Sequence, residues 1–509
     1  MMNTGVGRPS TVRALIDGHA AQRPDAVYAV STESDQRLTF AELARACRTV
    51  GALLRTHGVG PGDTVSLVLP NGLQTVRLLL GAMHAGCCVN PVNLLSQPEQ
   101  MRHVLAHSDC KLVFVASEWE ARVRALLAKI ERPVAVVVTD ADAPLDDGDA
   151  AACDSVSVSR PDDLALLMYT SGTTGVPKGV MLTQANLAAN AQAISAEHGL
   201  TADDRVLAVL PLYHINAFAV TMLAPLAHGG SLAMPPRFSA ARFWQQAADS
   251  GCTWINVVPT MISYLLEGPV PAREQTARLR FCRSASAALP PEHLLAFEQR
   301  FGIGIIETMG LTETVAPAFS NPLDPDRRKV GSVGRASGCE ARVVDATLQP
   351  VADGATGEIA IRGPNVMRGY YKDPAATAAA FTPDGWLRTG DLGHRDGDGF
   401  FFVTGRIKEL IIKGGENIAP REIDEVLLAH PAVLEAAATG LPDRHYGQDI
   451  LACVVLREGC ACTEEALRLF CVERLGAFKT PKVIRFVAEL PRGPSGKVQR
   501  LKLLDSPVG

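Results

Sequence analysis

The sequence predicts an α/β protein with a large N-terminal domain of doubly wound sheets, a β-barrel-like part, and a small α+β C-terminal domain. Three features predict this architecture. Short apolar runs alternate with Ala-rich helical stretches through about the first 300 residues, Gly-punctuated short strands begin near residue 330, and helical patterns return after Arg406. A chain of 509 residues also exceeds what one hydrophobic core usually organises, so at least two domains are expected.

The apolar runs of the first part are rich in Val, Leu and Ile. Because they are apolar on both faces and are separated by helix-length segments, they predict parallel strands covered by helices on both sides. Examples are TVSLVLP (64–70), KLVFVAS (111–117), PVAVVVTD (133–140), RVLAVLPL (205–212) and TWINVVPT (253–260). The acidic, turn-rich region 141–163 is expected to be a surface connection.

The segments GSVGRA, ARVVD, GEIAIRG and GFFFVTGR, which follow residue 330, are typical of antiparallel or barrel strands. Farther on, PREIDEVLLAHP (420–431) and TEEALRLFCVERL (463–475) predict two helices, with strand-like segments between and after them. A domain of ~100 residues accommodates this last stretch. We therefore expect an N-terminal domain at 1–405 and a C-terminal domain at 409–509.

Composition excludes several classes of protein. Hydrophobic residues make up 47% and charged residues 20% of the chain, as in ordinary globular proteins, and the net charge of -5 argues against a broad nucleic-acid surface. No apolar stretch approaches the ~20 residues of a membrane span, and no signal-peptide core is present. The 12 cysteines lack zinc-site spacing and are expected to be thiols in a reducing cytoplasm.

The segment LALLMYTSGTTGVPKGVMLTQANL (164–187) predicts a strand, a Ser/Thr/Gly-rich turn and then a helix capped by Thr183. Glycines let a backbone approach a ligand closely, and hydroxyls, backbone N–H groups and a lysine can surround phosphate oxygens. A flexible surface loop is the alternative, and the segment is not a Walker A sequence. The residues expected to hold phosphate are Thr170, Ser171, Gly172, Thr173, Thr174, Gly175 and Lys178.

The string YTSGTTGVPKG resembles the phosphate-loop signature of the adenylate-forming superfamily, which comprises acyl-CoA synthetases, luciferases and peptide-synthetase adenylation domains. Further motifs of that superfamily follow in order along nearly the entire chain. The resemblance implies ATP, Mg²⁺ and coenzyme A as cofactor and co-substrates, and a mobile C-terminal domain.

ETMGLTET (307–314) looks like the superfamily's adenine and magnesium segment. By this resemblance Thr312 contacts the α-phosphate and Glu313 holds Mg²⁺, which prefers carboxylate and phosphate oxygens. The superfamily usually has an aromatic residue where this chain has Met309. Because methionine also packs on ring faces, altered adenine packing is expected there. Taken alone, Glu313 would be read as a solvated glutamate.

WLRTGDLG (386–393) resembles the ribose-binding segment, which implies that Asp391 accepts hydrogen bonds from the ribose hydroxyls. In the segment that resembles the interdomain crossover (405–424), Arg406 would reach the ribose or phosphate. The resemblance also implies a hinge at 406–408, in which Lys408 is the hinge residue. The same resemblance places Gly414 and Gly415 on the path of the coenzyme A pantetheine.

LPRGPSGKVQR (490–500) places Lys497 on a Gly/Pro/Ser loop whose PSGK sequence resembles the catalytic-lysine motif of the superfamily. An ammonium there neutralises the charge that gathers as a carboxylate attacks the α-phosphate. His214, in PLYHIN (211–216), matches a position that flanks the acyl site, and is expected to position the substrate. Read singly, Lys497 would be a surface lysine and His214 a structural histidine.

The acyl pocket is expected to involve His214, Arg283, Ser284 and Ser286, because RFSAARFW (237–244) and CRSASAALPP (282–291) look most like oxalyl-CoA synthetases. That group acts on very small acids, some with a second anionic group. A buried arginine without a partner is costly, so Arg283 is expected either to face solvent or to pair with an anion. TMG at 308–310 departs from the oxalate-type pattern, which leaves other small dicarboxylic or sulfonated acids open.

The predicted function is an ATP-dependent carboxylic acid–CoA ligase, with Lys497, Lys178, Thr312 and His214 as catalytic residues. Its partners would be a small carboxylic acid, ATP and coenzyme A, without nucleic acid or membrane, and it is a candidate homodimer. Alternatives are a medium-chain or aromatic acyl-CoA synthetase, a stand-alone carrier-protein acyl ligase, and a nucleotide-binding pseudoenzyme. Joint retention of Lys178, Glu313, Asp391, Arg406 and Lys497 argues against the last of these.

Overall fold

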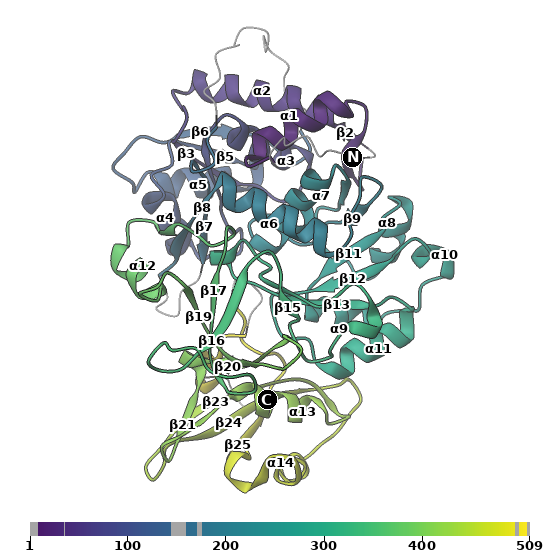
Figure 1. The fold of residues 1–509 in the computed structure, drawn as a ribbon, viewed down its shortest axis with the longest axis vertical. Coiled ribbons are helices and arrows are strands. Elements are labelled where there is room, and N and C mark those ends of the chain that lie inside the picture. Colours follow the sequence, from purple (N-terminus) through teal and green to yellow (C-terminus); the bar gives the residue numbers. More distant parts are fainter. Residues whose placement is uncertain (1–8, 35, 144–158, 171–175, 494–497, 506–509) are drawn as a thin grey trace.

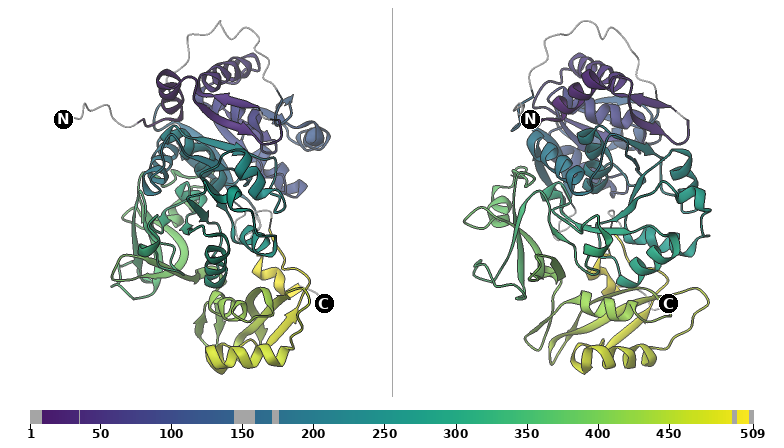
Figure 2. Two further views of the ribbon diagram at one scale, coloured as in Figure 1. Left: turned by 90° about the vertical axis from the view of Figure 1, so that its right-hand side faces the viewer. Right: turned by 45° about the vertical axis from the view of Figure 1, so that its right-hand side comes forward.

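The structure is a computed structural model, and it describes residues 9–34, 36–143, 159–170, 176–493 and 498–505. Three β-sheets and their helices form the larger part of the molecule, and the chain from Ile411 onward forms a smaller unit at one end (Figures 1 and 2). This arrangement confirms the predicted fold class.

The largest sheet has nine strands, with six parallel strands at its centre and antiparallel strands at both edges. Its order is β15 (Arg335–Ala336), β14 (Phe319–Ser320), β13 (Ile305–Met309), β12 (Phe281–Ser284), β11 (Trp254–Val257), β9 (Arg205–Leu207), β10 (Ser231–Met234), β1 (Val27–Ser31) and β2 (Arg37–Thr39). All residues of β10, β11 and β12 are buried, as expected for strands covered on both faces.

A second, seven-stranded sheet carries the predicted phosphate segment at one edge. Its order is β18 (Gly369–Tyr370), β8 (Lys178–Thr183), β7 (Leu164–Thr170), β4 (Cys88–Pro91), β3 (Thr64–Val68), β5 (Leu112–Val115) and β6 (Ala135–Val138). Strands β7 to β6 are parallel, whereas β8 and β18 are antiparallel to their neighbours. One hydrophobic core joins the two sheets through residues such as Val65, Leu166 and Ile255.

Helices cover both of these sheets (Figure 1). Those of the N-terminal part are α1 (Val12–Gln22), α2 (Phe40–Thr56), α3 (Leu73–His84), α4 (Pro98–His107), α5 (Glu120–Leu127), α6 (Gln184–Glu197), α7 (Ala224–His228), α8 (Phe243–Asp249), α9 (Pro259–Glu267), α10 (Arg273–Thr276), α11 (Pro291–Phe301) and α12 (Pro374–Ala380), with the π-helix η3 (Ala217–Leu223) leading into α7. Among these described helices none is long and apolar enough to cross a bilayer.

The Gly-punctuated region forms a four-stranded antiparallel sheet in the order β16 (Glu340–Val344), β17 (Gly357–Arg362), β19 (Leu387–Arg395) and β20 (Phe401–Arg406). Its apolar face has a core of its own, in which Ile359, Ile361 and Phe401 pack against Phe319 of the nine-stranded sheet. Met309, at the end of β13, also packs against this core.

The C-terminal unit is a five-stranded sheet with two helices. The strands are β21 (Ile411–Lys413), β22 (Glu416–Ile418), β23 (Val433–Asp443), β24 (Gly447–Leu456) and β25 (Val483–Phe486), and the helices are α13 (Pro420–Leu428) and α14 (Glu464–Lys479). Its core, which includes Ile411, Ile423, Val454 and Leu467, is separate from that of the large sheets. The two predicted helices of this unit are thus present, whereas the predicted domain bounds and hinge stay predictions.

Candidate active site

The predicted phosphate loop joins two strands paired edge to edge. Thr170 ends β7 and lies opposite Lys178, the first residue of β8. Ser171, Gly172, Thr173, Thr174 and Gly175 lie outside the described residues. The predicted helix does not follow the turn directly, because β8 intervenes. Thr183 does cap α6, its hydroxyl accepting a hydrogen bond from the Asn186 N–H at 3.2 Å.

Lys178 and Glu313 both contact Tyr370. The Lys178 ammonium lies 5.1 Å from the centre of the Tyr370 ring, and the Tyr370 hydroxyl donates to Glu313 Oε1 at 2.8 Å. Asp373 Oδ2 is 4.0 Å from the same ammonium. Burial, and then the Glu313 carboxylate, raise the pKa of Tyr370 well above its ordinary value, so the phenol stays a donor. Tyr370 thereby orients the carboxylate expected to hold magnesium.

The donor set around Glu313 fits Mg²⁺ bound together with nucleotide. No group of three or more His, Cys, Asp or Glu that could hold a metal occurs in the described parts of the chain. Mg²⁺ is commonly held by one or two carboxylates plus substrate phosphates, with waters completing its shell. Glu313, in the 3₁₀ turn Thr312–Thr314, offers one such carboxylate beside Lys178. Glu313 would hold the ion together with phosphate oxygens.

The two residues predicted at the ribose face each other across a strand pair. Asp391 on β19 lies opposite Arg406 on β20, and Arg406 Nε is 2.9 Å from Asp391 Oδ1. The Asp391 side chain is buried, whereas 45% of the Arg406 side chain is exposed. Met309 is half-buried at the end of β13. Because the Arg406 side chain is partly exposed, its guanidinium can reach a ligand while it pairs with the buried Asp391 carboxylate.

Two residues predicted at the acyl pocket, His214 and Ser286, lie at unusual features of the backbone. The His214 ring lies 4.8 Å from the Tyr213 ring, and its carbonyl accepts from Phe218 N at the start of the π-helix. Ser286 is exposed and has φ +76°, a conformation that L-residues rarely adopt. Ser284 is fully buried. Strained backbone and π-helices both concentrate at functional sites.

Arg283 lies inside the protein, which rules out the first of the two expected positions, a guanidinium facing solvent. Its side chain has no exposed area, and its guanidinium donates to Thr308 Oγ1 at 2.6 Å and Asn256 Oδ1 at 3.3 Å. Arg283 Nε has no hydrogen-bond partner among the described residues. Its partners are thus neutral side chains of the neighbouring strands β11 and β13. Burial lowers the pKa of Arg283 to about 9. Because this value is still above neutral pH, the guanidinium stays charged there.

Sequence reasoning gave no role to Glu307, Asn216 and Asn256, although each lies in a quoted segment. All three are buried. Burial raises the pKa of Glu307 to about 7, opposed by Arg421 and by a hydrogen bond from the Leu289 N–H. The available signal was a polar residue inside an apolar run, as in TWINVV.

The predicted hinge and coenzyme A segments are adjacent in the structure. Lys408 lies in the 3₁₀ turn η6 (Ile407–Glu409), directly after β20. Gly414 and Gly415 make the turn between β21 and β22 with φ of +58° and +90°, so glycine is favoured at both positions. A Cβ at residue 414 would lie 3.2 Å from Tyr446 Cδ1. Lys497 lies outside the described residues.

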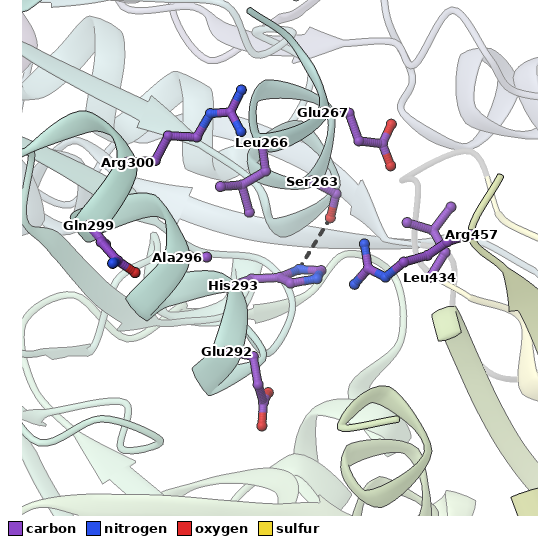
Figure 3. A pocket seen from close by; sticks show the side chains of 10 residues that line it. All are labelled: Ser263, Leu266, Glu267, Glu292, His293, Ala296, Gln299, Arg300, Leu434 and Arg457. Atoms are coloured by element: carbon purple, nitrogen blue, oxygen red, sulfur yellow. Dashed lines mark hydrogen bonds between the residues drawn. The ribbon is translucent and has the colours of Figure 1, made fainter. Parts of the chain in front are cut away.

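A cavity of about 440 Å³ lies apart from the predicted site residues, between α9, α11 and the C-terminal unit (Figure 3). His293 Nδ1 is 3.3 Å from Ser263 Oγ within it, and Arg457 of the C-terminal unit lies beside them. Glu267 and Glu292 also line it, so the cavity carries both signs of charge. None of the residues predicted to bind substrate or nucleotide lines this cavity.

Known proteins match this chain along most of its length. Residues 16–371 match the AMP-binding enzyme family, and residues 422–497 match the AMP-binding enzyme C-terminal domain. The chain belongs to the AMP-binding enzyme family. It is an AMP-forming acid–thiol ligase that uses ATP, Mg²⁺ and coenzyme A.

Two curated relatives and one solved structure illustrate the match. A sulfoacetate–CoA ligase of Cupriavidus necator is 60% identical over 97% of both chains. An oxalate–CoA ligase of Arabidopsis thaliana is 38% identical over 96% of this chain and 97% of its own. The ATP-bound MatB of Rhodopseudomonas palustris superposes with a TM-score of 0.91 at 31% identity, covering 97% of this chain and 98% of that one.

Proposed function

We propose that this ligase activates a small carboxylic acid that carries a second anionic group, of the sulfoacetate type. The observation that carries the proposal is the 60% identity to a sulfoacetate–CoA ligase over nearly the whole chain. The buried, charged Arg283 behind the acyl segments supports it, because burying a charge is costly and a pocket for long or aromatic acids gains nothing from that cost.

In the first half-reaction, a carboxylate oxygen of the acid attacks the α-phosphorus of ATP. The new O–P bond forms as the bond between the α-phosphorus and its bridging oxygen breaks, and pyrophosphate leaves. Lys178 and the loop 170–175 hold the phosphates, Thr312 contacts the α-phosphate, and Lys497 bridges the two anions. Magnesium bound at Glu313 would add charge neutralisation to the phosphates.

The nucleoside of ATP is held by a different set of residues. Asp391 accepts from the ribose hydroxyls, and Arg406, which Asp391 orients at 2.9 Å, contacts the ribose or phosphate. Met309 packs on the adenine. His214 and Ser286 position the acid at the mouth of the acyl pocket. These roles follow the resemblance and the local geometry.

In the second half-reaction, the thiolate of coenzyme A attacks the acyl carbon and AMP leaves. We infer that the unit 409–509 rotates about residues 406–408 against the unit 1–405, withdrawing Lys497 and bringing Gly414 and Gly415 to the site. Lys408→Pro, which fixes φ near -65°, tests this. It should make acyl-AMP in a single turnover and form thioester poorly. Normal steady-state thioester formation by a folded Lys408→Pro protein would refute the hinge.

A panel of acids tests the substrate class. Pyrophosphate release is measured with and without coenzyme A for oxalate, malonate and sulfoacetate against acetate, butyrate and octanoate. Highest kcat/KM is expected for a short acid with two negative groups. A preference for octanoate would reject the proposed acid while leaving the ligase activity intact. Transfer of the acyl group to a carrier protein, with none to free coenzyme A, would reject coenzyme A as the acceptor.

Two further expectations are independent of the acid. A homodimer is proposed, and light scattering at assay concentration tests it. A cytoplasmic location is proposed from the sequence, and fractionation of cells tests it. Neither changes the assignment of the site residues.

A further inference from the structure

Behind the acyl segments, a continuous row of hydrogen-bonded side chains runs from the buried Arg283 to the exposed Ser286. Arg283 Nη1 donates to Asn256 Oδ1 at 3.3 Å, Asn256 Nδ2 donates to Asn216 Oδ1 at 3.3 Å, and Asn216 Nδ2 donates to Ser286 Oγ at 3.2 Å. Arg283 and Asn256 are fully buried, and Asn216 is 5% exposed. The four residues come from β12, β11, the start of the π-helix and the turn after β12.

The row has a direction, which Arg283 fixes. A guanidinium has only donors, so the Asn256 side chain must present its oxygen to it. Asn256 then has only its NH₂ to offer to Asn216, and Asn216 in turn has its NH₂ toward Ser286. Without a fixed donor at one end, each amide could turn over and exchange its oxygen and nitrogen. The charge at Arg283 therefore sets the orientation of two neutral amides.

The consequence appears at Ser286. Its oxygen accepts from Asn216, so its hydroxyl proton is available to another acceptor. Ser286 lies at the exposed end of the row, and the buried Arg283 has no surface through which a ligand could touch it directly. The row thus transmits the polarity of a buried cation to an exposed hydroxyl, because each donor in it points toward Ser286.

We propose that Arg283 is a positioning residue for substrate selection, which acts through Asn256 and Asn216 to direct the Ser286 hydroxyl at the second anionic group of the acid. This inference rests on the proposed function. It differs from direct pairing of Arg283 with the substrate, because the group that touches the anion is Ser286.

The test compares kcat/KM for sulfoacetate with kcat/KM for acetate in one preparation of each variant, so that losses of folding or adenylation cancel in the ratio. Ser286→Ala and Arg283→Met should each lower the ratio roughly 10- to 100-fold, the effect of losing one hydrogen bond to a charged group. Most of the change should appear in the KM for sulfoacetate. The double variant should lower the ratio no further than either single variant.

Asn216→Asp sharpens the test, since an isosteric carboxylate accepts hydrogen bonds and cannot donate to Ser286. It should remove the preference for sulfoacetate. Thr308→Val is the matched control. It removes the Thr308 hydroxyl that accepts from Arg283 at 2.6 Å and leaves the hydrogen bonds from Arg283 through to Ser286 in place. The protein should therefore lose stability and keep the ratio.

The outcomes separate the two proposals. If wild type uses sulfoacetate and acetate with nearly equal kcat/KM, the proposal of a substrate with a second anionic group is wrong, and so is the proposed role of the row. A high wild-type ratio that Ser286→Ala leaves unchanged overturns the row alone, and if Arg283→Met still abolishes it, the anion meets Arg283 directly. Equal losses for both acids in Arg283→Met would make Arg283 purely structural.

Discussion

The nucleotide segments and the acyl segments of this ligase carry their positive charge at different depths. In the proposed nucleotide site, Lys178 and Arg406 have 36% and 45% of their side chains exposed, each near an aspartate. Behind the acyl segments, Arg283 is fully buried among neutral partners. The first group of charges can meet a ligand directly, and the second can act only through the side chains in front of it.

This difference matches what each part must do. Exposed cations bind phosphates strongly enough to orient them and weakly enough to release pyrophosphate and AMP in each turnover, because water screens them. A buried charge is not screened, and it holds its neighbours in one arrangement, as discrimination between small acids requires. The predictions below test these two parts, from the largest expected effect to the smallest.

Lys497→Ala should have the largest effect, and it should be confined to the nucleotide chemistry. Loss of one charge-stabilising group costs about 2.7–4 kcal/mol, or roughly 100- to 1,000-fold in rate. Adenylation should fall by this factor, while supplied acyl-AMP is still converted to thioester. Pyrophosphate release and thioester formation are measured separately. Equal loss of both half-reactions would show that Lys497 is not specific to the first.

Glu307→Gln tests burial on the acyl side. The pKa of Glu307 is raised from 4.5 to about 7, so its contribution to stability is fully present below about pH 4.5 and is lost as pH rises through about 7. The side-chain oxygen of glutamine can still accept the hydrogen bond from the Leu289 N–H, and the side chain carries no charge at any pH. The variant should therefore be more stable than wild type by about 3 kcal/mol above pH 7 and equal to it near pH 4.5.

Melting temperatures at both pH values measure this effect. The Thr308→Val protein serves as a comparison, because it loses stability without changing a titrating group of the same strand. A Glu307→Gln protein whose advantage over wild type does not grow with pH would show that Glu307 titrates normally.

Tyr370→Phe should weaken magnesium use while preserving the ring beneath Lys178. The lost hydrogen bond to Glu313, 2.8 Å long, is half-buried, so an effect near the lower end of 1.5–3 kcal/mol is expected, or about tenfold in the Mg²⁺ concentration required. Tyr371→Phe is the matched control. The neighbouring hydroxyl donates to Asp109 on the surface, and its loss should leave the magnesium requirement unchanged.

Ionic strength should have the smallest effect, and it separates the two parts directly. Raising it from about 0.1 M to about 1 M shortens the screening length from about 10 Å to about 3 Å. The KM for ATP should rise roughly two- to fivefold, in line with exposed ion pairs. The ratio of kcat/KM for sulfoacetate to that for acetate should change by less than about twofold, since Arg283 is buried. A larger change in that ratio would place the selecting charge at the surface.

Sequence patterns sufficed for the parts of this molecule that depend on local periodicity. The apolar runs gave β3, β5, β6, β9 and β11 at their predicted places, and Thr183 caps α6 as expected. The strand β8 was missed because KGVMLT is short and forms a strand through its antiparallel pairing with β7. Local pattern carries no information on that pairing.

Candidate site residues could be predicted only where they belong to a recognisable sequence motif. Lys178, Glu313, Asp391 and Arg406 were predicted in this way, and the structure brings the first two together through Tyr370 and pairs the last two. Tyr370 and Asn216 were missed because their roles depend on a partner distant in the sequence. The burial of Arg283 among neutral side chains was not predicted, because its partners on β11 and β13 are distant in the sequence.

The two-residue strand β18 pairs with β8 only late in synthesis of the chain. β18 covers the outer edge of β8, and Tyr370 is translated about 190 residues after Lys178. At about 5–20 residues per second, that edge stays open on the ribosome for roughly 10–40 seconds. An open, largely apolar edge strand is a template for pairing with another chain. Chains that stop short of Gly369 keep this edge permanently, and we expect aggregation of incomplete products to begin there.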